Sequence, residues 1–80
     1  LELRQPLRQA LPVPELSPKE RETLMLLAEG CNDREIAVRL RIVEATVRFH
    51  LKQIFAKLGA QNRTHAVSIA HRLGLAGDVG

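Results

Sequence analysis

Residues 45–58 constrain the fold most strongly, because their apolar side chains recur at helical spacing. The stretch reads ATVRFHLKQIFAKL, and its apolar positions follow at spacings of four, three and four residues. These positions are Val47, Leu51, Ile54 and Leu58. At about 100° per residue they form one stripe along a helix. The stretch therefore predicts an amphipathic helix that buries this stripe in a core.

The opposite face of this helix has an unusual composition for a surface in contact with water. It carries Arg48, Phe49, Lys52, Gln53 and Ala56, and no acidic residue occurs from position 45 through 62. A solvated helix face normally mixes both signs of charge and holds few aromatic residues. Arg48 and Lys52 lie one turn apart beside the outward Phe49, and such a face is better fitted to bind a polyanion than to contact water. We therefore predict that this helix enters the major groove of DNA.

The distribution of charge along the chain is uneven. Residues 14–35 hold three basic and six acidic side chains, whereas residues 36–63 hold six basic side chains and one acidic side chain, Glu44. The net charge of the 80 residues is only +3, with a pI near 9.8. A basic half is the expected footprint of a nucleic-acid binder. On charge alone, a solvated basic surface remains an equal alternative.

The composition and the capping signals predict an all-α domain of four helices. Apolar residues make up 45% of the chain, yet it has two Phe and no Tyr or Trp, which favours packed helices with an aliphatic core. Ser17 with Glu20, Asn32 with Glu35, and Asn62 are predicted N-caps, and glycines mark three helix ends. The predicted helices span about 17–29, 33–40, 44–58 and 63–73.

The order of these elements predicts a helix-turn-helix. A short helix, a turn at residues 41–43 and a basic amphipathic helix follow one another in the order typical of that motif. An ordinary helical hairpin is the alternative, but it would not require the charge asymmetry. The predicted inward positions of the other three helices are Thr23, Leu24, Leu27, Ala28, Ile36, Ala37, Leu40, Ala66, Ile69, Ala70 and Leu73.

The ends of the chain indicate the domain organisation. Residues 1–15 contain three prolines and are predicted to be an interdomain linker, with a short helical turn near 7–11. The domain is expected to span residues 16–75, followed by a frayed tail at 76–80. Since the chain begins with Leu1, we expect it to be part of a longer protein.

Several classes of function are disfavoured by the residues that the chain contains. Cys31 is the only cysteine, so no internal disulfide forms and the cytoplasm is a compatible location. Cys31 and the three histidines do not have metal-ligand spacing, and no cofactor is expected. No apolar run is long enough to cross a membrane. Without a nucleophile–base pair or a phosphate-binding loop, the sequence does not predict an enzyme.

Three segments carry a resemblance to a known family. They read LSPKERETL, then LLAEG followed by NDREIA, then TVRFHLKQIFAKLGAQNRTHAV. In this order and spacing, residues 16–75 resemble the C-terminal DNA-binding domain of LuxR/FixJ/NarL-type bacterial transcriptional regulators. The resemblance implies sequence-specific binding to double-stranded DNA as a homodimer, with the third helix in the major groove. It also implies a separate N-terminal sensor domain. RNA polymerase is a further candidate partner.

One position departs from the family pattern. Val43 stands where the family commonly has a serine that caps the third helix. The valine side chain offers no acceptor to the free N–H groups of the first turn. We therefore expect Val43→Ser to stabilise the domain.

Candidate site residues follow from the helix faces and from the resemblance. Base contacts are predicted for Arg48, Phe49 and Lys52, with phosphate contact the alternative for both cations and scaffold packing the alternative for Phe49. Phosphate contacts are predicted for Asn32, Arg34 and Thr46 near helix starts, and the resemblance implies such contacts for Lys57, Asn62, Arg63 and Thr64. A dimer surface on the fourth helix is predicted at Val67 and His71. His50 is expected to be a packing residue.

Two other functions fit parts of the pattern. Region 4 of sigma factors, a promoter-binding module, shares the first two types of segment, but the KLG and NRT segments argue against it. A helical protein-interaction module without DNA binding is the second alternative. It would be expected to lack the cations, whereas Arg48 and Lys52 are present.

Overall fold

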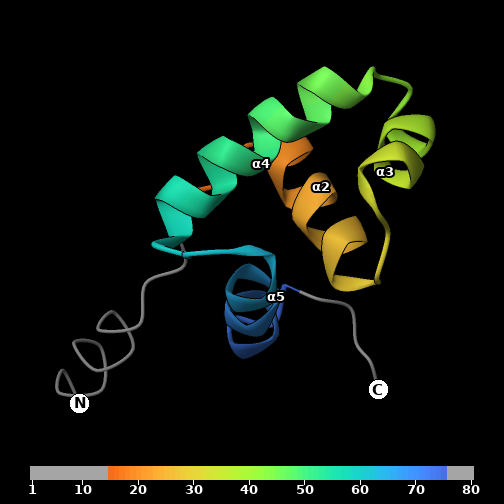
Figure 1. Ribbon diagram of the computed structural model, residues 1–80. Helices are drawn as coiled ribbons and strands as arrows, with labels where there is room; N and C mark the ends of the chain where they lie inside the picture. The colour runs from red at the N-terminus through yellow and green to blue at the C-terminus, as the bar shows by residue number, and fades with distance from the viewer. Residues whose placement is uncertain (1–14, 76–80) are drawn as a thin grey trace, which may run out of the picture.

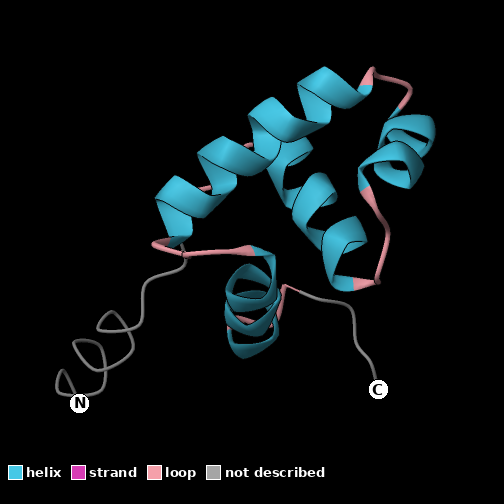
Figure 2. Cartoon of the chain, viewed as in Figure 1, coloured by secondary structure: helices cyan, strands magenta, loops and turns pink. Residues whose placement is uncertain are grey.

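The computed structural model describes residues 15–75, which fold into four helices and no strand (Figures 1 and 2). The helices are α2 (Pro18–Ala28), α3 (Asp33–Leu40), α4 (Glu44–Leu58) and α5 (Arg63–Arg72). The predicted all-α class is confirmed, and each helix end lies within one residue of its expected position. The predicted helical turn at 7–11 and the frayed tail at 76–80 lie outside the described residues.

The first two helices begin with reciprocal capping boxes, as the sequence predicts. The Ser17 hydroxyl accepts a hydrogen bond from the backbone N–H of Glu20 (3.1 Å), and Glu20 Oε1 accepts one from the Ser17 N–H (2.9 Å). Asn32 and Glu35 repeat the exchange at α3, with both distances 2.8 Å. Each box satisfies two backbone donors that a helix start otherwise leaves free. These caps fix where α2 and α3 start.

The helix ends use the left-handed backbone region in two ways. Gly59 ends α4 at φ 70°, a conformation that strains residues with a Cβ atom. Arg41 ends α3 at φ 60°, although it is not a glycine, and the sequence did not predict this. The N–H of the next residue, Ile42, donates to the carbonyl oxygen of Ala37 (3.0 Å). The chain therefore reverses within residues 41–43, which makes the turn between α3 and α4.

The helices share one aliphatic core. α2 packs against α4 and α5, and α3 packs mainly on α4 (Figure 1). The predicted stripe of α4 supplies three buried residues: Val47 and Ile54 are fully buried and Leu51 is 4% exposed. Burial of each such side chain contributes roughly 1.5–3 kcal/mol. The rest of the core is Leu24, Leu26, Leu27, Ile36, Ala37, Ala66 and Ala70.

Some predicted inward positions lie at the rim of this core. Ala28, Leu40, Leu58, Ile69 and Leu73 are only half-buried. Four of these five residues stand at a helix end, and a domain this small cannot cover the ends of its helices completely. Conversely, Leu26 was not predicted to be buried but belongs to the core.

One carboxylate is buried at the edge of the core. Glu20 is 7% exposed, and its Oε1 accepts a hydrogen bond from Lys57 Nζ at 2.7 Å. The Lys57 ammonium also donates to the carbonyl oxygen of Glu15 (3.3 Å). The bond from Lys57, followed by the bond from the Ser17 N–H, lowers the pKa of Glu20 below its ordinary value, against the opposing effect of burial. This pair ties the first turn of α2 to the last turn of α4.

Replacing Glu20 with Gln should make stability less dependent on pH. The pKa of Glu20 is depressed in the folded state, so its stabilisation is present above the ordinary value of 4.5 and is lost as pH falls through the folded-state pKa. At neutral pH we expect a loss of about 1–2 kcal/mol, less than for a fully buried pair, because Lys57 is partly in water. Urea unfolding at several pH values measures this.

In the acid range the difference between wild type and Glu20→Gln should shrink. Glu22→Gln, at an exposed position of the same helix, is the matched control and should change stability little. If Glu20→Gln loses as much stability in the acid range, below pH 4.5, as it does at neutral pH, the ionised carboxylate does not have this role.

Replacing Val43 with Ser should stabilise the domain. Val43 occupies the N-cap of α4 (φ −86°, ψ 160°), and its side chain makes no capping hydrogen bond. The side chain is 65% exposed, so little apolar burial is lost. A serine hydroxyl there accepts from the first turn, which contributes about 0.5–2 kcal/mol. Thermal or urea unfolding measures the gain.

Val38→Ser is the control for this substitution. Val38 is 72% exposed but lies inside α3, where a hydroxyl has no free N–H to cap. It should therefore not stabilise. Equal effects of the two substitutions would show that capping is not the cause.

Candidate nucleic-acid interface

The outer face of α4 is exposed along its whole length. All five residues expected there are exposed: Arg48, Phe49, Lys52, Gln53 and Ala56. Phe49 is 57% exposed to solvent, which is unusual for a large apolar side chain. The buried stripe on the other side of α4 fixes this orientation. The helix therefore presents an aromatic ring beside two cations.

Phe49 is supported at one edge by its neighbour. The rings of Phe49 and His50 lie 6.0 Å apart between centroids, with their planes inclined at 59°. This separation is within the range of favourable aromatic pairs. His50 is half-buried, in agreement with a packing role. The contact leaves most of the Phe49 ring free for a ligand.

The two cations of this face differ in their surroundings. Arg48 Nη1 lies 3.8 Å from Glu44 Oε1, one turn earlier on α4, and both side chains are about half exposed (59% and 47%). Such a surface pair is weak, since water screens it. Lys52 has no ion-pair partner within residues 15–75. Both cations are thus available to a polyanion, because only the weak Glu44–Arg48 pair has to be broken.

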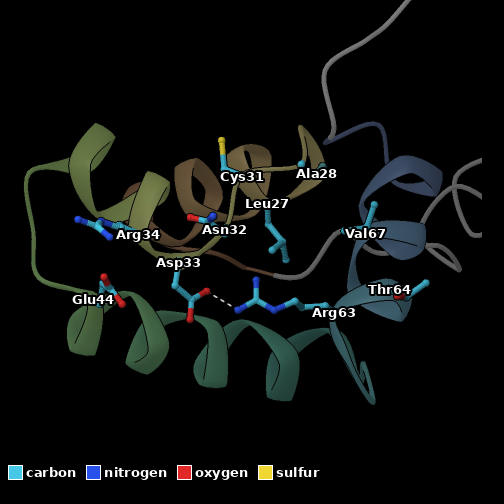
Figure 3. Close-up of a pocket in the computed structure, with 11 residues that line it drawn as sticks. Leu27, Ala28, Cys31, Asn32, Asp33, Arg34, Glu44, Arg63, Thr64 and Val67 are labelled. Carbon is cyan, nitrogen blue, oxygen red and sulfur yellow. Dashed lines mark hydrogen bonds and ion pairs between the residues drawn. The ribbon is translucent and has the colours of Figure 1, made fainter.

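An open groove lies beside α4, between the first turns of α3 and α5 (Figure 3). It brings together residues that lie 30 positions apart in sequence, and Asp33 forms an ion pair with Arg63 across it. Glu44 and the end of α2 complete the lining. Four of the seven predicted phosphate contacts line this groove: Asn32, Arg34, Arg63 and Thr64.

The other three predicted phosphate contacts have different positions. Thr46 is half-buried in the first turn of α4. Asn62 caps α5, where its Oδ1 accepts from the N–H of His65 at 2.8 Å. Lys57 points to α2, where its ammonium is held by Glu20, and it is not part of the groove.

The two residues predicted to form a dimer surface lie one turn apart on α5. Val67 is half-buried and lines the groove, whereas His71 is exposed. Within residues 15–75 there is no group of three or more potential metal ligands. No helix in that range is long and apolar enough to cross a membrane.

Sequence reasoning missed three acidic partners of the predicted cations: Glu44, Asp33 and Glu20. Glu44 and Arg48 stand four residues apart, and this spacing alone is a recognisable signal for an ion pair on a helix. Asp33 and Arg63 meet only because α3 and α5 both pack against α2 and α4, so no local pattern points to their pairing.

The family comparison agrees with this geometry. Residues 14–70 match the model of the family described as bacterial regulatory proteins, luxR family. Over 52 residues the chain is 50% identical to the probable HTH-type transcriptional regulator GfsR of Streptomyces halstedii. That match covers 65% of this chain and 21% of the relative, so the chain corresponds to about a fifth of the length of GfsR.

Solved structures of related proteins share the fold. The transcription factor GerE superposes with a TM-score of 0.71 at 35% identity, covering 78% of this chain and 92% of GerE. VqmA of Vibrio cholerae, a LuxR-type receptor solved as a dimer in the absence of target DNA, gives a TM-score of 0.76 at 27% identity. It covers 79% of this chain and 28% of VqmA.

Proposed function

The chain belongs to the luxR family of bacterial regulatory proteins, a family of DNA-binding transcription regulators, and we propose that it reads double-stranded DNA with α4 in the major groove. The observation that carries this proposal is the exposed face of α4, with Arg48, Phe49 and Lys52 on a helix whose other side is buried. An α-helix fits the major groove of B-DNA.

Three side chains of α4 are proposed to contact bases. Arg48 can donate two hydrogen bonds to O6 and N7 of guanine. Phe49 offers an apolar surface to the methyl group of thymine. Lys52, one turn after Arg48, reaches a further guanine or a phosphate. Because sequence is read at base edges, these residues would set the operator preference.

The phosphate contacts are proposed to flank α4. Asn32 and Arg34 at the start of α3, Thr46 in α4, and Asn62, Arg63 and Thr64 at the start of α5 are the candidates. Asn32, Arg34, Arg63 and Thr64 lie along one groove, which supports a shared role. Lys57 is the weakest candidate, because its charge is already compensated by Glu20. Contacts of this kind position the domain without reading sequence.

The proposed regulator acts as a dimer and contains more than this domain. We propose that residues 16–75 act as the output domain of a longer regulator, joined through a linker at 1–15. We also propose that two copies pair with each other through α5, at Val67 and His71, when they bind DNA. VqmA, which has been solved as a dimer and also in a complex with DNA, supports the dimeric part of this proposal. RNA polymerase is a proposed partner, the cytoplasm the proposed location, and no catalytic activity is proposed.

Two alanine substitutions test the groove assignment. Arg48→Ala should relax the preference at one base position, at a cost of about 1–3 kcal/mol on the selected site. Arg63→Ala should weaken all duplexes alike and reduce the salt slope by about one. Binding is measured on a site selected from random DNA and on random duplexes, at several salt concentrations.

Arg21→Ala, at an exposed position of α2, is the control for the loss of one positive charge. It should leave the base preference unchanged. If Arg48→Ala and Arg63→Ala both bind selected and random duplexes like wild type, α4 does not occupy the groove as proposed.

A further inference from the structure

Glu44 is an exception in the basic part of the molecule. It is the only acidic residue between positions 36 and 75. It is the first residue of α4 and is exposed, one turn from Arg48. On a face that approaches phosphates, a carboxylate is repelled and lowers affinity for any duplex. Its presence on this face therefore requires another explanation.

Helix capping does not explain the orientation of this carboxylate. The carboxylates of Glu20 and Glu35 accept hydrogen bonds from the N-cap N–H groups of their helices. Glu44 makes no such bond within residues 15–75, and one of its oxygens lies 3.8 Å from the Arg48 guanidinium. The Glu44 side chain is thus exposed where the outer face of α4 meets the groove beside it (Figure 3). A negative charge near a helix N-terminus is favourable in itself, but that effect does not require this orientation.

The spacing of Glu44 and Arg48 matches neighbouring bases. Four residues correspond to a rise of about 6 Å along a helix. Successive base pairs are separated by about 3.4 Å. When Arg48 contacts a base edge, the carboxylate one turn away is therefore within two base pairs of it. The two side chains present opposite charges to that short stretch.

From this geometry we propose that Glu44 determines specificity by accepting a hydrogen bond from an exocyclic amino group in the major groove. Cytosine N4 and adenine N6 are the donors there, whereas guanine O6 and N7 and thymine O4 would be repelled. Glu44 thus selects an amino-bearing base within two base pairs of the guanine bound by Arg48. The inference rests on the proposed placement of α4 in the groove.

Glu44 also disfavours the wrong sequences. Where the contacted position carries guanine or thymine, the Glu44 carboxylate meets a carbonyl acceptor and the phosphates in place of an amino donor. Specificity is a difference of affinities, and weakening the competitors increases it as much as strengthening the correct site does. A single acidic side chain on a basic face therefore lowers binding to random DNA while the correct base compensates it on the operator.

The test is a selection from random duplex DNA with the 80-residue chain. Wild type should select cytosine or adenine at one position near the guanine whose preference depends on Arg48. Glu44→Ala should lower discrimination at that position about tenfold, the size of one good base contact, and should bind random duplexes more tightly. Glu44→Gln should shift the preference toward adenine, since Gln can bind adenine N6 and N7 together.

Glu22→Ala is the control, since it removes one negative charge from an exposed position of α2. It should select the same site as wild type. If Glu44→Ala retains the wild-type preference while Arg48→Ala relaxes it, the inference on Glu44 is wrong and the groove assignment stands. If wild type itself selects no sequence, the proposed function fails and this inference fails with it.

Discussion

The burial of Val47, Leu51 and Ile54 fixes the rotation of α4 about its axis. These side chains share one core with residues of α2, α3 and α5, and two of them are completely buried. Turning the helix would expose them and bury Arg48 or Lys52, each at a cost of several kcal/mol. The buried face of α4 therefore determines which side chains the opposite face presents to a partner. This coupling makes one helix both a structural and a recognition element.

The cations of the site are held by acidic side chains of graded burial. Glu20 is almost completely buried, and its bond to Lys57 joins the end of α4 to the start of α2. Asp33 is partly covered where it holds Arg63, whereas Glu44 holds Arg48 at half exposure. A phosphate or a base competes most easily where water already screens the pair. This difference in burial separates the structural pair, Glu20–Lys57, from the two pairs whose cations can exchange the carboxylate for a group of DNA.

Most of the fold was predictable because its signals are local. The stripe of α4 and the capping residues Ser17, Asn32 and Asn62 are read within a few positions of sequence, and each is present in the structure. The exposed face with Arg48 and Phe49 follows from the same helical period. The all-α helix-turn-helix class was therefore predictable from the sequence.

The features that were missed depend on packing between distant segments. The Glu20–Lys57 and Asp33–Arg63 pairs join residues 37 and 30 positions apart, and no local rule couples them. The left-handed Arg41 was missed because this region usually calls for glycine or asparagine. Contacts with bases and phosphates were predicted from residue types and the family resemblance.

Chemical protection of a selected duplex tests most directly whether α4 occupies the major groove. Dimethyl sulfate methylates guanine N7 in the major groove and adenine N3 in the minor groove, so one reagent probes both. With α4 in the major groove, we expect the domain to protect guanine N7 within the selected site and to leave adenine N3 there reactive. Protection of adenine N3 with guanine N7 still reactive would contradict this placement of α4.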